Sequence, residues 1–248
     1  MKYAILSDIH GNLEALETVL ADAKENGCEK HICGGDVVGY NANPAECMAV
    51  VREMDMPCVK GNHDEYVSDE AMDLATFNPV AAAAVVWTRE QLSEKQLKWL
   101  KELRYLAYNR EKDQPKFCIV HATMDSPRAW GYVQDIKGAA CSFNYQTTPV
   151  CFHGHTHAPV AFTEDRLKNI THNFYETVEV EDNKRYFINV GSVGQPRDGD
   201  PRAAYAIYDT EEAIIELRRL DYDLETTQEK IRAAGLPERL ADRLAQGK

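Results

Sequence analysis

Short apolar stretches alternate with helical patterns along the first quarter of the chain. Residues 2–6 (KYAIL) form an apolar run of strand length, and residues 30–33 and 58–60 form two more. A helix is predicted after Asn12, a good N-cap, and should end near Asn26-Gly27; its apolar positions are Leu13, Leu16, Leu20 and Ala23. Residues 43–46 (NPAE) predict a second helix start with a capping box. This repetition of strand, loop and helix indicates an α/β fold.

Helical patterns dominate residues 65–111, with helix starts predicted at Asn78-Pro79 and at Ser93. Two buried strands are predicted at residues 117–120 and 150–152. The segment between them, 122–148, is irregular apart from a short helix at 136–143, so it is a candidate substrate loop.

The last third of the chain is rich in strand patterns. Strands are predicted at residues 160–163, 177–180, 185–190 and 203–209, and the last should pair with residues 213–217 as a hairpin. Two helices follow, at 224–234 and 237–245. Because no repeat or linker interrupts the chain, we predict one domain, residues 1–248, with a helical tail from about 222 to 248.

Composition narrows the classes of partner. The 248 residues include 28 basic and 40 acidic ones, and the net charge of -12 disfavours stable binding to nucleic acid. An anionic substrate remains compatible, because bound cations can invert the charge of a site. No apolar run approaches the roughly 20 residues that cross a bilayer, and Met1-Lys2 leads directly into a strand. We therefore expect a soluble cytoplasmic protein without a membrane partner; its oligomeric state is not predicted.

Seven cysteines are scattered along the chain without C-x-x-C spacing. That pattern indicates neither a zinc ribbon nor a redox motif. Several of them lie within apolar runs, where a free cysteine acts as a small hydrophobic residue. Buried thiols in a reducing cytoplasm are the expected state.

Polar residues able to bind a metal ion follow five predicted strands. Alternate residues of a strand share a face, so Asp8 and His10 would project toward one point if the extended conformation continued to residue 10. Taken alone, such a pair is more typical of a capped turn, and a single histidine after an apolar run is more often an ordinary core or surface residue. Together, five such strand ends form an unusual set, comprising Asp8, His10, Asp36, Asn62, His63, His121, His155 and His157.

The mixture of carboxylate, amide and imidazole groups limits which metal ions the site would prefer. Such sites suit Mn, Fe, Zn, Co or Ni rather than Ca or a thiolate cluster, and we favour Mn. The set is large enough for two ions if one carboxylate bridges them. Two ions about 3.5–4 Å apart stabilise both the attacking and the leaving oxygen in a displacement at phosphorus.

The motifs resemble those of the calcineurin-like metallophosphoesterase superfamily in order, spacing and residue type. They are Asp8-x-His10, Gly35-Asp36, Gly61-Asn62-His63-Asp64, His121 and Gly154-His155-Thr156-His157. The resemblance implies a four-layer αββα sandwich of two mixed β-sheets flanked by helices. It also implies two metal sites that share Asp36: one with Asp8, His10 and His157, the other with Asn62, His121 and His155. His63 would face the substrate without binding metal, and the role of Asp64 is left open.

The chemistry and the resemblance together imply hydrolysis of a phosphodiester or phosphomonoester, in a phosphorylated small molecule or nucleotide-type substrate. A hydroxide that bridges the two ions would attack phosphorus, and His63 would protonate the departing oxygen or steady the transition state. Asn12, Arg128 and Arg197 are possible substrate-binding residues, although residues 192–197 (SVGQPR) are equally typical of a surface turn. Three further histidines match no family position and are expected outside the site: His31, His153 and His172.

Two features narrow the branch of the family. Asp36 is followed by Val37-Val38-Gly39-Tyr40-Asn41, and not by the Asp-Arg-Gly of protein Ser/Thr phosphatases and symmetrical dinucleoside tetraphosphatases. Those activities are therefore not expected. The chain is more similar to the small bacterial and archaeal phosphodiesterase-like branch, which fits Asn189-Val190-Gly191-Ser192 near the final strands. A non-catalytic interaction scaffold, the role of this fold in the retromer coat, is the alternative; the presence of His63 favours the enzyme.

Overall fold

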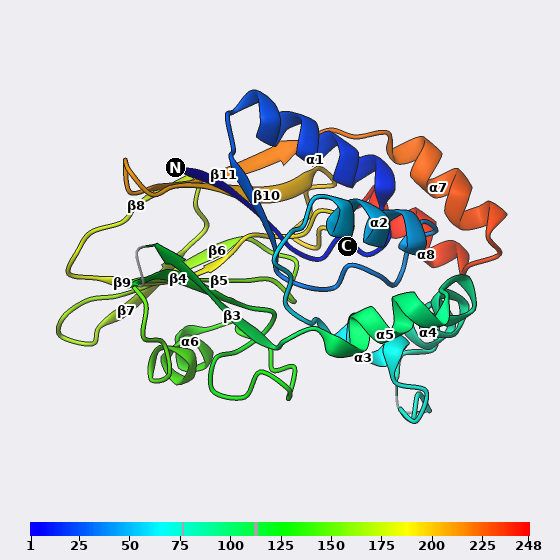
Figure 1. Ribbon diagram of the computed structural model, residues 1–248, viewed down its shortest axis with the longest axis horizontal. Helices are drawn as coiled ribbons and strands as arrows, with labels where there is room; N and C mark the ends of the chain where they lie inside the picture. The colour runs from blue at the N-terminus through cyan, green and yellow to red at the C-terminus, as the bar shows by residue number, and fades with distance from the viewer. Residues whose placement is uncertain (76, 112–113) are drawn as a thin grey trace.

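The computed structural model describes residues 1–75, 77–111 and 114–248, and it contains two mixed β-sheets (Figure 1). The first sheet has the order β2-β1-β10-β11-β8, with β2 (Lys30–Cys33), β1 (Lys2–Leu6), β10 (Ala203–Asp209), β11 (Ile214–Leu220) and β8 (Thr177–Glu179). The second has the order β3-β4-β5-β9-β6-β7, with β3 (Leu106–Glu111), β4 (Gln114–Val120), β5 (Val150–His153), β9 (Arg185–Asn189), β6 (Val160–Glu164) and β7 (Ile170–Asn173). The pairs β1–β2 and β4–β5 are parallel, so the carboxyl ends of these strands point the same way within each sheet.

The two sheets pack face to face over a buried aromatic core. Phe117 of β4 lies 5.5 Å from Phe152 of β5 between ring centroids, and both rings contact Tyr208 of β10 in the opposite sheet. Helix α6 (Ile136–Phe143) packs against the outer face of the six-stranded sheet. The predicted four-layer αββα sandwich is confirmed.

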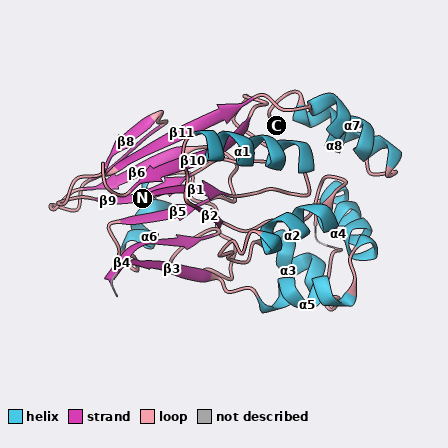
Figure 2. Ribbon diagram, turned by 45° about the horizontal axis from the view of Figure 1, so that its top comes forward, coloured by secondary structure: helices cyan, strands magenta, loops and turns pink. Residues whose placement is uncertain are grey.

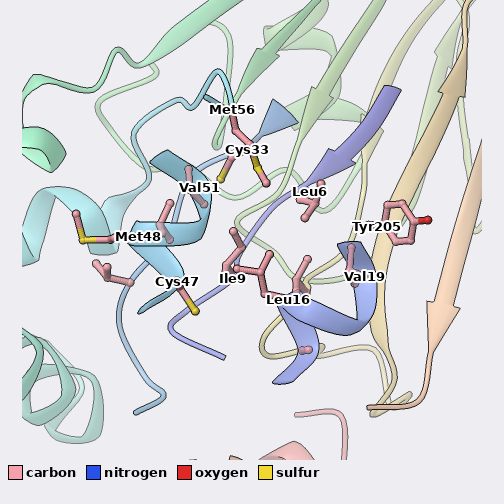
Figure 3. Packing of buried hydrophobic residues seen from close by; sticks show 14 of the residues in the cluster. Leu6, Ile9, Leu16, Val19, Cys33, Cys47, Met48, Val51, Met56 and Tyr205 are labelled. Atoms are coloured by element: carbon pink, nitrogen blue, oxygen red, sulfur yellow. The ribbon is translucent and has the colours of Figure 1, made fainter. Parts of the chain in front are cut away.

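Two helices cover the outer face of the five-stranded sheet (Figure 3). These are α1 (Leu13–Glu25) and α2 (Pro44–Glu53). Leu16 of α1 and Met48 of α2 are fully buried in one cluster with Leu6 of β1 and Tyr205 of β10. Apolar residues on alternate positions of β1 thus serve two cores, since Ile5 faces the other sheet and Leu6 faces the helices.

The remaining helices gather beyond one end of the strands (Figure 2). They are α3 (Asn62–Ser68), α4 (Pro79–Gln91), α5 (Glu94–Glu102), α7 (Leu224–Ala233) and α8 (Glu238–Leu244). None of the helices in the described part of the chain is long and apolar enough to cross a bilayer. All seven cysteines are free thiols, and Cys33, Cys47, Cys118 and Cys151 are buried.

The helix caps follow the sequence prediction in one case and depart from it in another. Asn12 caps α1, because its Oδ1 accepts a hydrogen bond from Ala15 N at 3.1 Å. Helix α2 begins at Pro44 as expected, but the predicted capping box does not form. The Asn43 N–H, which Glu46 would have had to satisfy, donates instead to the carbonyl oxygen of Gly11 at 3.0 Å.

The sequence-based assignment of secondary structure needs correction at three places. Residues 106–111, predicted as helix, form β3, because pairing along β4 overrides their local preference. Residues 58–60 were predicted as a strand but form only isolated bridges, from Cys58 to Cys33 and from Val59 to Arg104. Strand β7 was not predicted; its sequence, ITHN, is mostly exposed and becomes a strand by pairing with β6.

The inter-sheet core makes a stability prediction. Phe152→Ala should lower the free energy of unfolding by about 3–5 kcal/mol, because a fully buried ring would leave a cavity between the sheets. Phe174→Ala serves as the control: that ring is 80% exposed, so its loss should change stability by no more than about 0.5 kcal/mol. Urea unfolding of the two variants measures both values, and equal losses would contradict this account of the core.

Candidate active site

The loops after β1 and β2 are joined by main-chain hydrogen bonds. Asp8 N donates to Gly35 O at 3.0 Å, and His10 N donates to Asp36 O at 2.8 Å. The condition set for Asp8 and His10 to project toward one point, an extended backbone as far as residue 10, is not met, because Asp8 and His10 have φ values of 55° and 51°. Asp36 is left-handed too, with φ 52°. The side chains converge because the loops hold these strained backbones, and such strain is common at functional sites.

Four buried side chains form a cluster at this point: Asp8, His10, Asp36 and His157, whose ligand atoms all lie within 4.8 Å of one another. His157 Nε2 is 3.1 Å from Asp8 Oδ1, and His10 Nε2 is 3.6 Å from Asp36 Oδ2. This is the set that the resemblance implied for one metal ion. The distances are suited to one small cation at the centre of the four groups.

A second group of candidate ligands adjoins Asp36 through His121. His121 Nε2 lies 3.4 Å from Asp36 Oδ2 and 3.1 Å from Asn62 Oδ1. The His155 ring is 5.0 Å from the His121 ring between centroids. Asp36 Oδ2 is buried, faces both His10 and His121, and has no hydrogen-bond partner among the described residues. An unpaired buried carboxylate oxygen between two groups of ligands is what a bridging metal ligand requires.

Main-chain carbonyls orient the four histidines that are candidate metal ligands. The outer ring nitrogens contact Val38 O (His10 Nδ1, 3.1 Å), Gly34 O (His121 Nδ1, 2.9 Å), Trp130 O (His155 Nε2, 2.9 Å) and Gln195 O (His157 Nδ1, 2.6 Å). A carbonyl can only accept, so each outer nitrogen carries the proton. The inner nitrogen is then available to a metal ion, the arrangement typical of metal-ligating histidines.

Burial and charge set the protonation of the cluster. Burial alone would raise the pKa of Asp8, but the adjacent His157 and His10 outweigh it and hold that pKa well below its usual value. Burial would lower the pKa of His121, but the Asp36 and Asp8 carboxylates raise it to about 10. Burial lowers the pKa of His155 to about 4 and that of His157 to about 3. In the metal-free cluster Asp8 is thus ionised, His155 and His157 are neutral, and His121 carries a second proton that it would release on binding a divalent cation.

Two glycines make room for the carboxylates. A Cβ atom on Gly61 would overlap Asp36 Oδ1, and one on Gly154 would overlap Asp8 Oδ2. Both glycines directly precede candidate ligands, Asn62 and His155. Their place in the motifs is therefore explained by close approach of the backbone to the carboxylates.

Asp64, whose role the sequence left open, ties two loops together. Its carboxylate accepts hydrogen bonds from Asp36 N at 2.8 Å, Val37 N at 2.9 Å and Gly61 N at 2.9 Å. It is fully buried, and burial together with the charge of Asp36 raises its pKa to about 7. Asp64 thus positions the loop that carries Asp36 and does not itself join the metal cluster.

His63 lies beside the cluster but outside it. Its main-chain N–H donates to Asp36 Oδ1 at 2.8 Å, and its ring centroid is 4.3 Å from that of Tyr40 and 4.9 Å from that of His10. Burial lowers the pKa of His63 well below its usual value. The imidazole lines a cavity of about 320 Å³, whose walls also include Tyr66, Phe77, Trp130 and Tyr132. Sequence reasoning missed this aromatic wall, because its members come from separate helices and loops.

The three possible substrate-binding residues lie in different environments. Asn12 is fully buried as a cap and donates to Gly194 O at 3.1 Å, so it acts within the fold. Arg128 is exposed and lies 4.6 Å over the Tyr105 ring. Arg197 lies nearer the site, 5.5 Å over the Tyr40 ring.

The remaining histidines lie outside the cluster. His153 is buried at the end of β5, where its ring stacks on Phe187 at 4.1 Å. His172 stacks on Phe162 on the outer face of the same sheet. His31 is half-buried on β2, before the loop that carries Asp36.

The loop contacts of Asp64 give a prediction. Asp64→Asn should lower the free energy of unfolding by about 2–4 kcal/mol and weaken metal binding, because an amide nitrogen cannot accept from the buried N–H groups. Asp165→Asn is the control, since that carboxylate accepts main-chain hydrogen bonds only in an exposed turn. Thermal unfolding and metal titration measure the effects; a stable Asp64→Asn variant with unchanged metal affinity would contradict the role given to Asp64.

Comparison with known proteins places the chain in a family. A calcineurin-like phosphoesterase superfamily domain matches residues 1–213. An uncharacterized protein of Methanocaldococcus jannaschii is 39% identical over 251 residues, which cover 99% of this chain and 98% of that protein. The crystal structure of a metallophosphoesterase from Sphaerobacter thermophilus has a TM-score of 0.87 at 40% identity, over 100% of this chain and 99% of the other. A hypothetical protein of Pyrococcus horikoshii OT3 shares the fold, with a TM-score of 0.81 at 18% identity over 100% and 98% of the two chains. The chain therefore belongs to the calcineurin-like phosphoesterase superfamily, among metallophosphoesterases of the small archaeal and bacterial type.

Proposed function

We propose that the protein is a binuclear metallophosphoesterase that hydrolyses a phosphodiester or a phosphomonoester. One observation carries this proposal: Asp36 and six other candidate ligands, from five chain segments, lie together, and His63 lies next to them without joining them. The family supplies the broad class, a phosphoric ester hydrolase with a buried Asp/His cluster. The number of ions and the type of ester are our inference.

The ligands divide into two groups that share Asp36. Asp8, His10 and His157 would complete one site, and Asn62, His121 and His155 the other. Divalent ions bound there would activate a water molecule and neutralise negative charge on the phosphoryl group. Oxygen and imidazole ligands without a thiolate suit Mn, Fe, Zn, Co or Ni, and we favour Mn.

We assign to His63 the role of protonating the oxygen of the leaving group or stabilising the transition state. Its ring lines the cavity beside the cluster, within reach of a group that leaves from a phosphoryl bound there. Burial keeps the imidazole neutral in the substrate-free protein. The negative charge of a phosphoryl group next to it would raise its pKa, as a general acid requires.

A phosphorylated small molecule or nucleotide-type compound is the expected substrate. The net charge of -12 disfavours a stable nucleic-acid complex, and the aromatic cavity is of a size for a small organic group. We keep the cytoplasm as the expected location, on the basis of the buried free thiols.

An interaction scaffold on the same fold is the competing function. A scaffold has no need of an imidazole beside the ligand set, nor of a cavity that opens onto it. Mn-reconstituted protein should hydrolyse p-nitrophenyl phosphate or bis-p-nitrophenyl phosphate, and the ratio of the two rates ranks monoester against diester. Protein with two ions bound that turns over neither compound would favour the scaffold.

Metal content tests the binuclear centre. The unmodified protein should bind two Mn ions per chain, and His155→Ala should bind about one, because His155 belongs to only one of the two groups. His172→Ala, on an exposed strand, should retain both. Elemental analysis after gel filtration gives the ratio; a single ion in the unmodified protein would contradict the proposal.

The role of His63 is tested by separating metal binding from turnover. His63→Ala should lower kcat by about 10²–10⁴-fold while it keeps both ions, because the side chain acts on the leaving group and not on the metal. His31→Ala, remote from the cavity, should retain full activity. If metal content and rate fall together in His63→Ala, the assignment is wrong.

A further inference from the structure

Three arginines lie next to the proposed active site and outside its candidate metal ligands. Arg239 and Arg243 are one helical turn apart on α8, and Arg197 follows β9 in the chain. Together with Tyr40 and Asn78 they line a cavity of about 190 Å³. The guanidinium carbons of Arg197 and Arg243 lie 5.5 Å and 6.0 Å from the centre of the Tyr40 ring.

This arginine cavity is held in place by a buried core. Leu240, Ala241 and Leu244 of α8 pack with Tyr40 and Ile231 in one apolar cluster. Gly199 N also donates to Gly247 O at 3.0 Å, which fixes the segment after α8. The helix that carries Arg239 and Arg243 is therefore docked against Tyr40 and is not a free surface arm.

Side-chain carboxylates do not pair with the arginines of the cavity. Although the chain has 40 acidic residues against 28 basic ones, none of the described Asp or Glu side chains forms an ion pair with Arg197, Arg239 or Arg243. Arg197 donates to Gln195 Oε1 at 2.8 Å, and Arg243 Nε donates to the main-chain oxygen of Lys248. The carboxylates closest in sequence are engaged elsewhere, Asp198 with Arg219, and both Glu238 and Asp242 with Arg232. Burial and the nearby charge of Arg197 lower the pKa of Arg243 to about 10. Arg197 and Arg243 are partly buried, and Arg239 is exposed beside them. Cations that repel one another in this way favour an anion between them.

Tyr40 connects the arginine cavity to the candidate metal centre. Its ring lies 4.3 Å from the His63 ring and 4.7 Å from the His10 ring between centroids. The arginine cavity and the larger aromatic cavity share Tyr40, Asn78 and Ala81 as wall residues, so they adjoin each other. One small molecule can therefore reach both the metal cluster and the arginines.

We infer that the arginine cavity binds a second phosphate group of the substrate, which would make the substrate a small organic bisphosphate. The scissile phosphoryl would lie at the metal cluster, and an aromatic ring of the substrate would lie against the walls formed by Tyr66, Phe77, Trp130 and Tyr132. This inference depends on the proposed function only for the placement of the scissile phosphoryl group at the metal cluster. The recognition by Arg239 and Arg243 depends on α8, which lies outside the residues that match the family domain.

The test compares two ligands that differ by one phosphate. Adenosine 3′,5′-bisphosphate and adenosine 5′-monophosphate are titrated calorimetrically into Mn-loaded protein that carries His63→Ala, so that neither ligand is consumed. The bisphosphate should bind about tenfold or more tightly than the monophosphate. Adding Arg243→Gln or Arg239→Gln should reduce that ratio to near one. Arg166→Gln, an exposed arginine on the far sheet, is the matched control and should keep it.

The outcomes separate the two proposals. Equal affinity for the two ligands, or a preference for the bisphosphate that survives in Arg243→Gln and Arg239→Gln, would overturn the second phosphate site. Circular dichroism of the variants shows that they are folded, so that lost binding is not lost structure. If the bisphosphate preference depends on these arginines but no phosphate ester is hydrolysed by the unmodified protein, the second site stands and the hydrolase proposal fails.

Discussion

Two carboxylates, Asp8 and Asp36, are almost completely buried at the carboxyl ends of neighbouring parallel strands. Removing two negative charges from water is costly unless compensating groups surround them. Here the compensation comes from nearby imidazoles and from two main-chain N–H groups, since His63 N donates to Asp36 and His155 N donates to Asp8. In our account two cations complete it. Much of the surrounding architecture follows from that need.

The loops show how the chain meets this demand. Main-chain hydrogen bonds between residues 8–11 and 35–37 hold the two acidic loops together, and the carboxylate of Asp64, in the first turn of α3, binds the main-chain N–H groups of the second loop. Left-handed backbone at Asp8, His10 and Asp36 turns the side chains inward. These strained conformations are tolerated because many hydrogen bonds determine the loops. Rigid loops of this kind can keep ligands in place before a metal ion binds.

The sequence predicted the fold where local signals and packing agreed. The first helix began after its predicted cap, and α6 covers the residues predicted for it. The apolar runs of β1, β4 and β5 were recognisable because both faces of these strands are buried. Strands β3 and β7 could not be found in this way, since their strand conformation depends on pairing with distant partners. The capping box at Asn43 does not form for a similar reason: the Asn43 N–H donates to the carbonyl oxygen of Gly11, which is remote in sequence, and not to the side chain of Glu46.

The site followed the same division. Residue type and order along the chain were enough to name the seven candidate ligands and His63, while the roles of Asp64, Tyr40 and the arginines of α8 depend on contacts between remote segments. The central claim is that Asp36 bridges two metal ions. Electron paramagnetic resonance of the Mn-loaded protein tests it directly: we predict the spectrum of an exchange-coupled pair of Mn²⁺ ions, which should become that of an isolated ion in His155→Ala. The spectrum of isolated ions in the unmodified protein, at full metal loading, would contradict the account.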